Sequence, residues 1–478
     1  LASTSLAVAV AGLFAAAAAA ETSGKASDCA AAGAVAGRFL GECRTREASL
    51  DSSVVGKAVH EHAASQAAVT ENPFTNRTFY VNPSYAASLD NSIITATGQI
   101  RATLQEMKDV PSAYWLDRKA KILGNGTRTM EGILADSAAK SPPHLVVFIV
   151  YDLPNRDCHA KASNGEICCT YQASGRCDYL APGNCSEGLA EYKSEYIDEI
   201  VSVLKRYAGN VPIVLVIEPD SLPNLVTNKA DPRCGNRATM EAYKRGITYA
   251  IESIAAAVPQ VPMYLDAGHG GWLGWRNNMD AFVPLIHELG IAKHLRGFAT
   301  NVAGYQSLGM MCPKYDWCLD RPHRNASCCL DPCNLLNQWN PSNNEANYAL
   351  HLKKAMGEGI TGFLPHVIID TGRNGVAGMR EDCSNWCNIR GAGVGLKPTT
   401  ETVDPRLIDA YFWLKTPGES DGCSETLPDG TKCPRFDSDC ASVDSLGTRT
   451  GEPPAPEAGD WFDFQVKMLA ENANMSQA

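Results

Sequence analysis

Two short apolar runs that each lead into a carboxylic acid constrain the fold of this chain most strongly. Val214 to Asp220 reads Val-Leu-Val-Ile-Glu-Pro-Asp, and the run from Val146 to Cys158 carries Asp157 next to its end. Unbroken apolar runs rich in β-branched residues are typical of strands buried on both faces of a parallel sheet. Parallel strands deliver their last residues to the same edge, so the two acids should lie close together. This arrangement predicts carboxylate chemistry on a sugar.

Further apolar runs alternate with helical patterns along the chain. Apolar residues recur every three or four positions from residue 189 to 207 and again from 238 to 258, which predicts two amphipathic helices. Strands are predicted at residues 146–150, 213–217, 262–266, 297–300, 363–370 and 411–415. Alternating strands and helices indicate an α/β fold whose parallel sheet closes as a barrel.

The first seventy residues differ in composition from the rest. Residues 1–20 are rich in alanine and end in small residues before Glu21, which predicts a secretory signal peptide; an apolar N-terminal anchor is the alternative. Residues 21–70 are interpreted as a linker or a small N-terminal segment, with Cys29 and Cys43 available to pair. Residues 71–478 are assigned to a single catalytic domain.

The cysteine content points to an oxidising compartment. The chain has 18 cysteines, an even number, and no Cys-x-x-Cys spacing that would indicate a zinc site. Asn-x-Ser/Thr sequons occur at Asn76, Asn125, Asn184, Asn325 and Asn474. We therefore expect a secreted glycoprotein, located outside the cell or in a cell wall.

The charge pattern narrows the range of partners. The net charge is −11 and no basic cluster is present, which argues against a nucleic-acid partner. No segment after residue 20 is apolar enough to cross a bilayer, so no membrane association is expected after signal removal. Neither a metal nor an organic cofactor is predicted.

Two cysteine-rich insertions interrupt the strand and helix pattern. They span residues 167–186 and 308–340, and both follow predicted strand ends. Loops of this length are uncommon unless they are functional or held together by crosslinks. Parallel barrels carry their active sites on the side where the strands end. We expect both insertions to shape a cleft.

Acids recur at the ends of the predicted strands, at Asp157, Asp220, Asp266, Asp370 and Asp421. Glycoside hydrolysis requires one protonated carboxylic acid and a means of activating water on the opposite face of the sugar. A neighbouring carboxylate keeps an acid protonated, because like charges disfavour double ionisation. The alternative is that these acids only cap helices or bind backbone amides. Five acids on successive strand ends favour the chemical interpretation.

Tryptophans in glycine-rich loops accompany these acids. Trp272 and Trp275 follow Asp266 and His269, and Trp386 lies in Asn-Trp-Cys-Asn. Exposed indole rings in such loops stack against the apolar faces of glucose units, whereas the alternative is burial in the core. Trp115 and Trp413 lie within predicted elements and are assigned to the core.

The motifs together resemble glycoside hydrolase family 6. The resemblance rests on Val-Tyr-Asp-Leu-Pro-Asn-Arg-Asp-Cys, Ile-Glu-Pro-Asp-Ser-Leu, Leu-Asp-Ala-Gly-His-Gly-Gly-Trp-Leu-Gly-Trp, Ala-Thr-Asn-Val-Ala and Lys-Thr-Pro-Gly-Glu-Ser-Asp-Gly, in that order, between residues 72 and 473. It implies a distorted seven-stranded parallel β/α barrel that hydrolyses β-1,4-glucan with inversion.

The resemblance also implies roles for individual residues. Asp220 matches the proton donor, and Asp157 matches the carboxylate that controls the donor's ionisation and is tied to the water relay. Asp421 matches a carboxylate debated as the general base, Tyr151 the tyrosine that crowds the distorted sugar, and Ser163 the serine that helps place water. Substrate-contacting or supporting positions are matched by Asp266, His269, Trp272, Trp275, Asn301, Trp386, Lys415 and Glu419. Tyr80 stands where the family often has a stacking tryptophan, which predicts weaker stacking there.

Two disulfides follow from the same resemblance, Cys158 with Cys234 and Cys387 with Cys440, and Cys423 with Cys433 would then close a hairpin in the last loop. The pairing of the other twelve cysteines stays open. The long stretch from Lys415 to Cys440 resembles the form found in cellobiohydrolases, in which this loop covers the cleft.

We therefore expect a monomeric, secreted, inverting cellulase that acts on cellulose or another β-1,4-glucan. Release of cellobiose from chain ends is the favoured mode. The alternatives are an endoglucanase, an enzyme that remodels the producer's own cellulosic wall, and a non-catalytic glucan-binding wall protein. The intact Asp157, Asp220 and Asp421 argue against the last of these.

Overall fold

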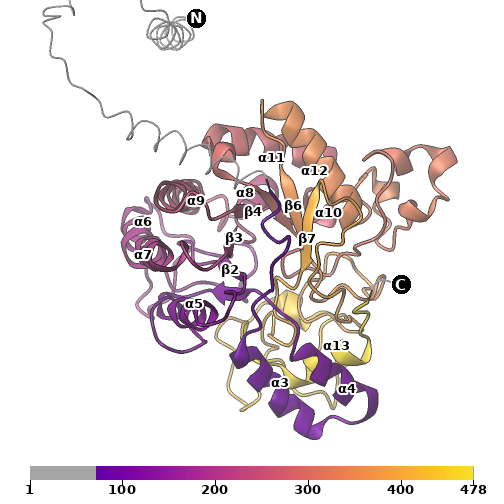
Figure 1. Ribbon diagram of the computed structural model, residues 1–478, viewed down its shortest axis with the longest axis horizontal. Coiled ribbons are helices and arrows are strands. Elements are labelled where there is room, and N and C mark those ends of the chain that lie inside the picture. The colour runs from indigo at the N-terminus through magenta and orange to yellow at the C-terminus, as the bar shows by residue number, and fades with distance from the viewer. Residues whose placement is uncertain (1–70, 477–478) are drawn as a thin grey trace, which may run out of the picture. The chain divides into compact units, whose positions relative to one another are not determined.

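A seven-stranded parallel sheet forms the centre of the computed structural model, which describes residues 71–476. The strands are β1 (Tyr114–Leu116), β2 (Val146–Val150), β3 (Ile213–Ile217), β4 (Met263–Asp266), β5 (Gly297–Thr300), β6 (His366–Asp370) and β7 (Ile408–Phe412). They follow one another in chain order, and each is parallel to the next. The sheet curls into a half-barrel, which agrees with the predicted fold class (Figure 1).

The two edge strands, β1 and β7, are not paired in a ladder of backbone hydrogen bonds. Individual hydrogen bonds link these strands and the residues next to them. The backbone N–H of Ala113, just before β1, donates to the carbonyl of Trp413 at 2.9 Å. The indole N–H of Trp115 donates to the carbonyl of Leu414 at 2.8 Å. These contacts bring the two edge strands together where the cleft lies.

Helices connect the strands and cover the outside of the sheet. The α-helices are α3 (Pro83–Thr95), α4 (Gly98–Met107), α5 (Met130–Ala138), α6 (Ser186–Glu191), α7 (Asp198–Tyr207), α8 (Leu222–Thr227), α9 (Arg237–Ala257), α10 (Gly270–Leu273), α11 (Arg276–Leu289), α12 (Glu345–Gly359) and α13 (Asp463–Glu471). A π-helical segment, η3 (Tyr192–Ile197), makes α6 and α7 continuous, and this continuous helix covers the predicted 189–207. Short 3₁₀ turns are η2 (Lys119–Lys121), η4 (Ala292–His294), η5 (Trp317–Leu319), η6 (Arg321–His323), η7 (Ser327–Cys329), η8 (Leu336–Gln338) and η9 (Ser438–Ala441).

The buried side chains form two main layers. Val147, Ile149, Val214 and Val216 point into the barrel with Tyr264. The alternate strand residues pack outwards against the helices in a larger cluster. Strands buried on both faces explain why β2 and β3 read as unbroken apolar runs.

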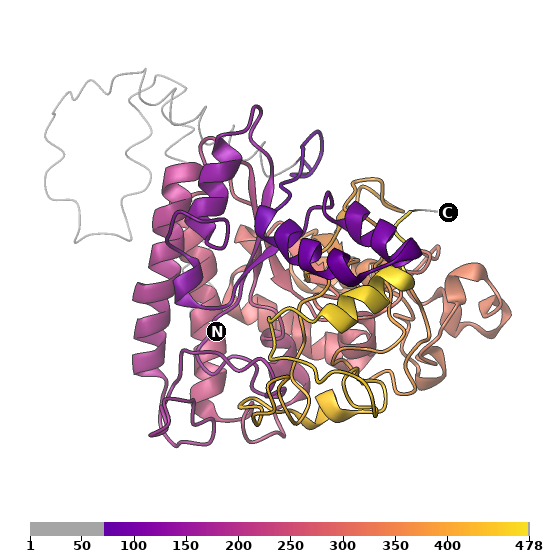
Figure 2. The same cartoon turned by 90° about the horizontal axis from the view of Figure 1, so that it is seen from below.

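The two ends of the described chain pack against each other. α13 lies beside α3 and α4, and the three helices form a separate apolar cluster (Figure 2). The indole N–H of Trp461 donates to the hydroxyl of Ser92 at 3.0 Å across this contact.

The strand predictions were correct for β2, β3 and β5 and nearly so for β4, whereas β6 begins three residues later than predicted. The prediction of residues 411–415 was wrong, because β7 spans Ile408–Phe412 and includes Asp409. A charged residue breaks the apolar pattern in the sequence, but Asp409 is buried with ionic and hydrogen-bonding partners. β1 was not among the individual predictions, since its three residues are too few to form a pattern.

Eight disulfides are present in the described part of the chain. Cys158–Cys234, Cys387–Cys440 and Cys423–Cys433 are the pairs expected from the sequence. The remaining pairs are Cys168–Cys177, Cys169–Cys185, Cys312–Cys328, Cys318–Cys329 and Cys333–Cys383. The first four of these crosslink the two insertions internally, and the last ties the second insertion to a loop after β6. The predicted signal peptide and the segment with Cys29 and Cys43 lie outside the described residues.

Candidate active site

A cavity of about 460 Å³ opens where the strands end. All five residues predicted to be catalytic line it: Tyr151, Asp157, Ser163, Asp220 and Asp421. Five of the predicted substrate-contacting residues line it too: His269, Trp272, Trp386, Lys415 and Glu419. The sheet therefore brings together side chains that are up to 270 positions apart in the sequence.

Asp220 follows β3 on a backbone that departs sharply from the strand. Glu218 and Asp220 have φ angles of 46° and 57°, in the left-handed region that non-glycine residues rarely adopt. The Asp220 N–H donates to Oδ2 of Asp266 at 3.1 Å, which holds this turn. Among the described residues no cation forms an ion pair with Asp220. Withdrawal from bulk water, and then the negative charge of Asp421, raise the pKa of Asp220 to about 7.

Asp157 follows β2 in a similar turn and is buried. Its φ is 57°, and the amide of Asn164 donates to its carbonyl at 2.9 Å. Burial, and then the charge of Asp220, raise the pKa of the Asp157 carboxyl well above its usual range. Two carboxyls that oppose each other's ionisation can keep one proton near neutral pH, which a general acid requires.

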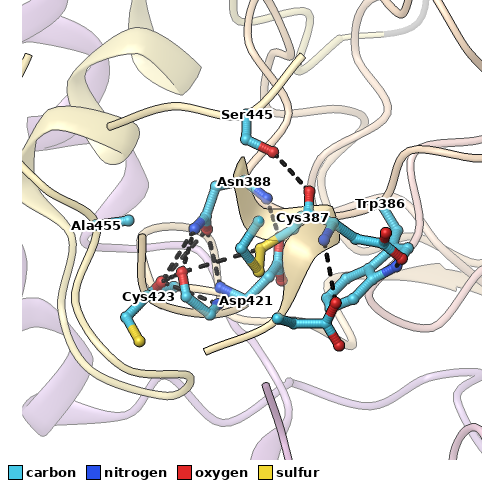
Figure 3. The surroundings of a disulfide bond; sticks show 12 residues. Trp386, Cys387, Asn388, Asp421, Cys423, Ser445 and Ala455 are labelled. Atoms are coloured by element: carbon cyan, nitrogen blue, oxygen red, sulfur yellow. Dashed lines mark hydrogen bonds between the residues drawn. A yellow bond between two sulfur atoms is a disulfide. The ribbon is translucent and has the colours of Figure 1, made fainter. Parts of the chain in front are cut away.

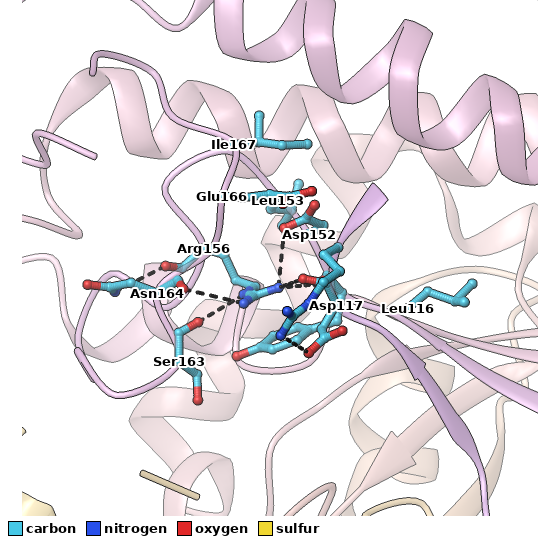
Figure 4. A network of polar contacts seen from close by, with 12 residues as sticks. Leu116, Asp117, Asp152, Leu153, Arg156, Ser163, Asn164, Glu166 and Ile167 are labelled. Carbon is cyan, nitrogen blue, oxygen red and sulfur yellow. Dashed lines mark hydrogen bonds and ion pairs between the residues drawn. The ribbon is translucent and has the colours of Figure 1, made fainter. Parts of the chain in front are cut away.

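Arg156 organises the wall that carries Asp157 (Figure 4). Its guanidinium donates to the carbonyls of Tyr151 at 2.6 Å, Asp117 at 2.7 Å and Ser163 at 2.9 Å. It also lies 4.3 Å from the centre of the Tyr151 ring. One buried cation thus fixes both Tyr151 and the loop of Ser163. Sequence reasoning missed Arg156, although its position directly before Asp157 was a usable signal.

Asp421 lines the same cavity from the loop after β7, and several hydrogen-bond donors hold its carboxylate. Nη1 of Arg373 lies 2.7 Å from both carboxylate oxygens, and the Tyr305 hydroxyl donates to Oδ2 at 2.8 Å. The N–H of Asn388 donates to the same oxygen at 2.8 Å, beside the Cys387–Cys440 disulfide (Figure 3). Arg373 and Tyr305 were not predicted. Arg373 follows Asp370 in a glycine-rich loop, and nothing in that loop indicated its partner.

Two of the five strand-end acids serve the backbone and do not line the cavity. Asp370 accepts hydrogen bonds from the N–H groups of Ala303, Gly372 and Lys415 at 2.8–2.9 Å. Asp266 accepts from Asp220 and Gly268. For this pair the backbone-binding alternative is the better description, and Asp266 supports the turn that carries Asp220. Asn301 is likewise buried behind the cavity, where its amide donates to the Asp370 carbonyl at 2.9 Å.

The tryptophans divide differently from the prediction. The assignment of Trp115 to the core was wrong, because its indole lines the cavity and meets the Tyr151 ring edge-on at 5.1 Å. Trp413 is fully buried, as predicted. Trp275 is half-buried and outside the cavity lining, with its indole N–H directed to the carbonyl of Gln338 at 3.2 Å.

Tyr80 is not at the cleft. Its ring is 3% exposed in the core, and its hydroxyl donates to Oδ2 of Asp136 at 2.7 Å. The proposed substrate contact of Tyr80 is therefore corrected. The residue precedes α3, and its N–H donates to the carbonyl of Leu145, just before β2, at 2.8 Å; no local pattern indicated that it would be buried.

His269 and the pair of Lys415 and Glu419 complete the polar lining. Withdrawal from water, and then the charge of Arg380, lower the pKa of His269 to about 3, so its imidazole is neutral. The side-chain amide of Gln306 lies 3.3 Å from Nδ1 of His269. Nζ of Lys415 lies 3.8 Å from Glu419. These groups suit hydrogen bonding to hydroxyls better than proton transfer.

Neither insertion supplies a cavity-lining residue among those described. Instead, each supports a lining loop. The Arg176 guanidinium donates to the carbonyl of Pro434 at 3.0 Å, and Cys333 is bonded to Cys383 in the cavity wall. The expectation that the insertions shape the cleft is therefore corrected: they do not line the cavity themselves but support loops that do.

The fold and cavity define a class of proteins in which a parallel β/α barrel presents paired carboxyls and tryptophans at its strand ends. The sequence profile of Glycosyl hydrolases family 6 matches residues 74–473, and the chain belongs to this family.

Known relatives agree with this assignment. The chain is similar to Exoglucanase 3 of Agaricus bisporus, with 37% identity over 408 residues that cover 84% of this chain and 79% of the relative. It is also similar to 1,4-beta-D-glucan cellobiohydrolase C of Emericella nidulans, with 36% identity over 420 residues that cover 86% and 80%. The chain is also similar to a solved structure of cellobiohydrolase II from Humicola insolens in complex with glucose and cellotetraose. The two superpose with a TM-score of 0.66 at 31% sequence identity, over 84% of this chain and 99% of the solved chain.

Proposed function

We propose that this protein is an inverting cellulase that releases cellobiose from chain ends of β-1,4-glucan. The observation that carries the proposal is the group of Asp220, Asp157 and Asp421 in one cavity with Trp115, Trp272 and Trp386. Family membership and relatives named exoglucanase and cellobiohydrolase support the same activity.

Asp220 is the general acid in this proposal. It has no ion-pair partner among the described residues, and its pKa of about 7 keeps it protonated in acid and partly protonated at neutral pH. It then donates its proton to the leaving glycosidic oxygen as the bond to the anomeric carbon breaks. The neutral acid is present before the substrate arrives, so no proton has to be recruited.

Water attacks the opposite face of the sugar, and its proton leaves towards Asp157. Asp421 is less suited to accept it, because Arg373, Tyr305 and Asn388 already donate to its carboxylate. Ser163 lies at the cavity wall on the loop that Arg156 fixes, which is a position suited to orienting water. Tyr151 and Trp115 crowd the site between the two acids' loops.

Contacts across the cleft favour action at chain ends. The N–H of Lys161 donates to Oδ2 of Asp437 at 2.5 Å, and Nη1 of Arg435 donates to the carbonyl of Asn164 at 3.3 Å. These bonds join the loop after β2 to the loop after β7 beside the catalytic residues. A cavity bridged in this way admits a chain by its end more readily than along its middle.

The eight disulfides of the described residues favour an oxidising, extracellular location. Among the described residues, no helix combines the length and the apolar character needed to cross a membrane.

Two measurements test the proposal. Proton NMR early in the hydrolysis of cellohexaose should show the α-anomer first, because inversion places water opposite the leaving group. An initial β-anomer would contradict inversion. Viscosity measured against reducing ends on carboxymethyl cellulose tests the mode of cutting, and a steep early fall in viscosity would contradict chain-end action.

A further inference from the structure

The second insertion, residues 308–340, carries an unusual tryptophan near its end. It projects from the molecule beyond α10 and α12 as the salmon-coloured loops at the right of Figures 1 and 2. Trp339 is 74% exposed, and it is the only tryptophan among the exposed large apolar residues of the described chain. Single exposed apolar side chains are common, so exposure alone has no implication.

The backbone of Trp339 provides a second observation. Its φ and ψ angles are 59° and 22°, in the left-handed region that is a genuine outlier for a bulky residue. Such a conformation persists only where the surrounding structure enforces it, and it is concentrated at functional sites. Here the strained residue is one that contributes nothing to the core.

Hydrogen bonds on both sides hold this conformation. The carbonyl of Gln338 accepts from the indole N–H of Trp275 at 3.2 Å. The N–H of Asn340 donates to the carbonyl of Leu335 at 3.0 Å, and its side-chain amide donates to the carbonyl of Gly270 at 2.8 Å. Asn340 is fully buried, so the backbone next to the exposed indole of Trp339 is held in place.

The hydrogen-bonded segment around Trp339 is connected to the wall of the cavity. Gly270 begins α10, the same helical turn that carries Trp272 into the cavity, and Trp275 follows directly after that turn. Cys333–Cys383 ties the insertion to a second segment of the cavity wall as well. Trp272, Trp275 and Trp339 therefore lie on one connected support that leads from the cavity to the surface.

We propose that Trp339 is a stacking platform for a β-1,4-glucan chain outside the cavity, next along the path after Trp275. The inference rests on the proposed function, because that function supplies the ligand. An indole face complements the apolar face of a glucose unit, and a fixed ring binds with little loss of conformational freedom. The platform acts only on chains long enough to extend beyond the cavity.

The test compares substrates of two lengths in Trp339→Ala. With cellotetraose the variant should equal the wild type in kcat and KM. On phosphoric-acid-swollen cellulose its binding and its rate at low substrate should fall by roughly two- to ten-fold, the range expected for one aromatic contact. Trp339→Tyr should restore most of the loss, because it retains a ring.

Leu364→Ala is the matched control. Leu364 is 69% exposed and precedes β6, at the end of the sheet away from the cavity, so this variant should behave as the wild type on both substrates. Equal binding of swollen cellulose by Trp339→Ala and the wild type would overturn the platform. A wild type that fails to cleave cellotetraose, while Trp339→Ala still loses cellulose binding, would refute the catalytic proposal and leave the platform supported.

Discussion

Asp409 and Asp220 lie at opposite ends of the same barrel and have opposite surroundings. Asp409, near the start of β7, accepts from Arg296 at 2.9 and 3.0 Å and from the Tyr264 hydroxyl at 2.6 Å. Burial opposes its ionisation, but hydrogen bonds from His366 and Arg296 outweigh this and lower its pKa. Asp220, beyond the end of β3, has no ion-pair partner among the described residues, and its pKa rises to about 7.

The difference distinguishes an acid that stabilises the fold from an acid that is suited to proton transfer. A buried carboxylate with its charge and hydrogen bonds satisfied holds strands together and cannot readily take up a proton. A carboxyl withdrawn from water without a cation keeps its proton and destabilises the fold when it ionises. In the part of the chain that the structure describes, Asp220 has this second arrangement, and it lies at the end of the barrel where the cavity opens.

The largest effect should come from Asp220→Asn. Loss of the general acid should lower kcat on cellohexaose by ~10²–10⁴, since an amide cannot donate the required proton. Binding of the oligosaccharide should persist. Initial rates and equilibrium binding measure the two separately, and near-wild-type rates would contradict the assignment.

The same variant should be more stable than the wild type at pH 7, by about 3–4 kcal/mol, because the pKa of Asp220 rises from 3.8 to about 7 and each unit corresponds to roughly 1.4 kcal/mol. The raised pKa of Asp220 means that its contribution to stability is complete below about pH 4 and is lost as the pH rises through about 7. The advantage of Asp220→Asn should therefore vanish in acid. Thermal unfolding at pH 4 and pH 7 provides the comparison.

Asp409→Asn is the reciprocal substitution. Leaving Arg296 without its carboxylate should destabilise the protein by about 3–5 kcal/mol at pH 7. The lowered pKa of Asp409 has the opposite sign, so the penalty should shrink as the pH falls through the folded-state pKa. Denaturant unfolding across pH measures this. The folded fraction should keep its kcat. A specific loss of kcat would show that Asp409 also affects the reaction, and would contradict a purely structural role.

A smaller effect is expected from Asp421→Asn on the pH profile. The wild-type rate should fall as the pH rises through about 7, where Asp220 loses its proton. The charge of Asp421 helps to raise that pKa, so its removal should move the alkaline limb to lower pH. The pH dependence of kcat/KM for cellotetraose gives the position of the limb. An unchanged limb would show that the two carboxyls do not interact.

The smallest effect should follow from replacing Cys423 and Cys433 by serine. Their disulfide closes a hairpin of sequence separation 10 in the loop after β7, away from the strands. The loop should become more mobile, and the viscosity assay should shift a few-fold towards internal cutting with little change on cellotetraose. Cys168 and Cys177 offer a matched pair in the first insertion, of separation 9, whose removal should act less directly on the cavity.

Local sequence patterns were sufficient to predict the parallel sheet and the acids that line the cavity. Strands buried on both faces require unbroken apolar runs, and an acid directly after such a run must lie at the strand end. This is why Asp157 and Asp220 were identified from local patterns and why family motifs located Asp421. The disulfides Cys158–Cys234 and Cys387–Cys440 followed from the family resemblance, and Cys423–Cys433 was inferred as an extra pair in the last loop.

The pairing of the polar groups, in contrast, depends on how distant segments pack together in the fold. Arg156, Arg373 and Tyr305 act through contacts with residues far along the chain, and no local pattern encodes them. The same reason explains the errors at Tyr80, Trp115 and Asp409. Whether a side chain is buried, lines a cavity or finds a counter-charge depends on which other segments pack against it, and that is set by the folded half-barrel as a whole.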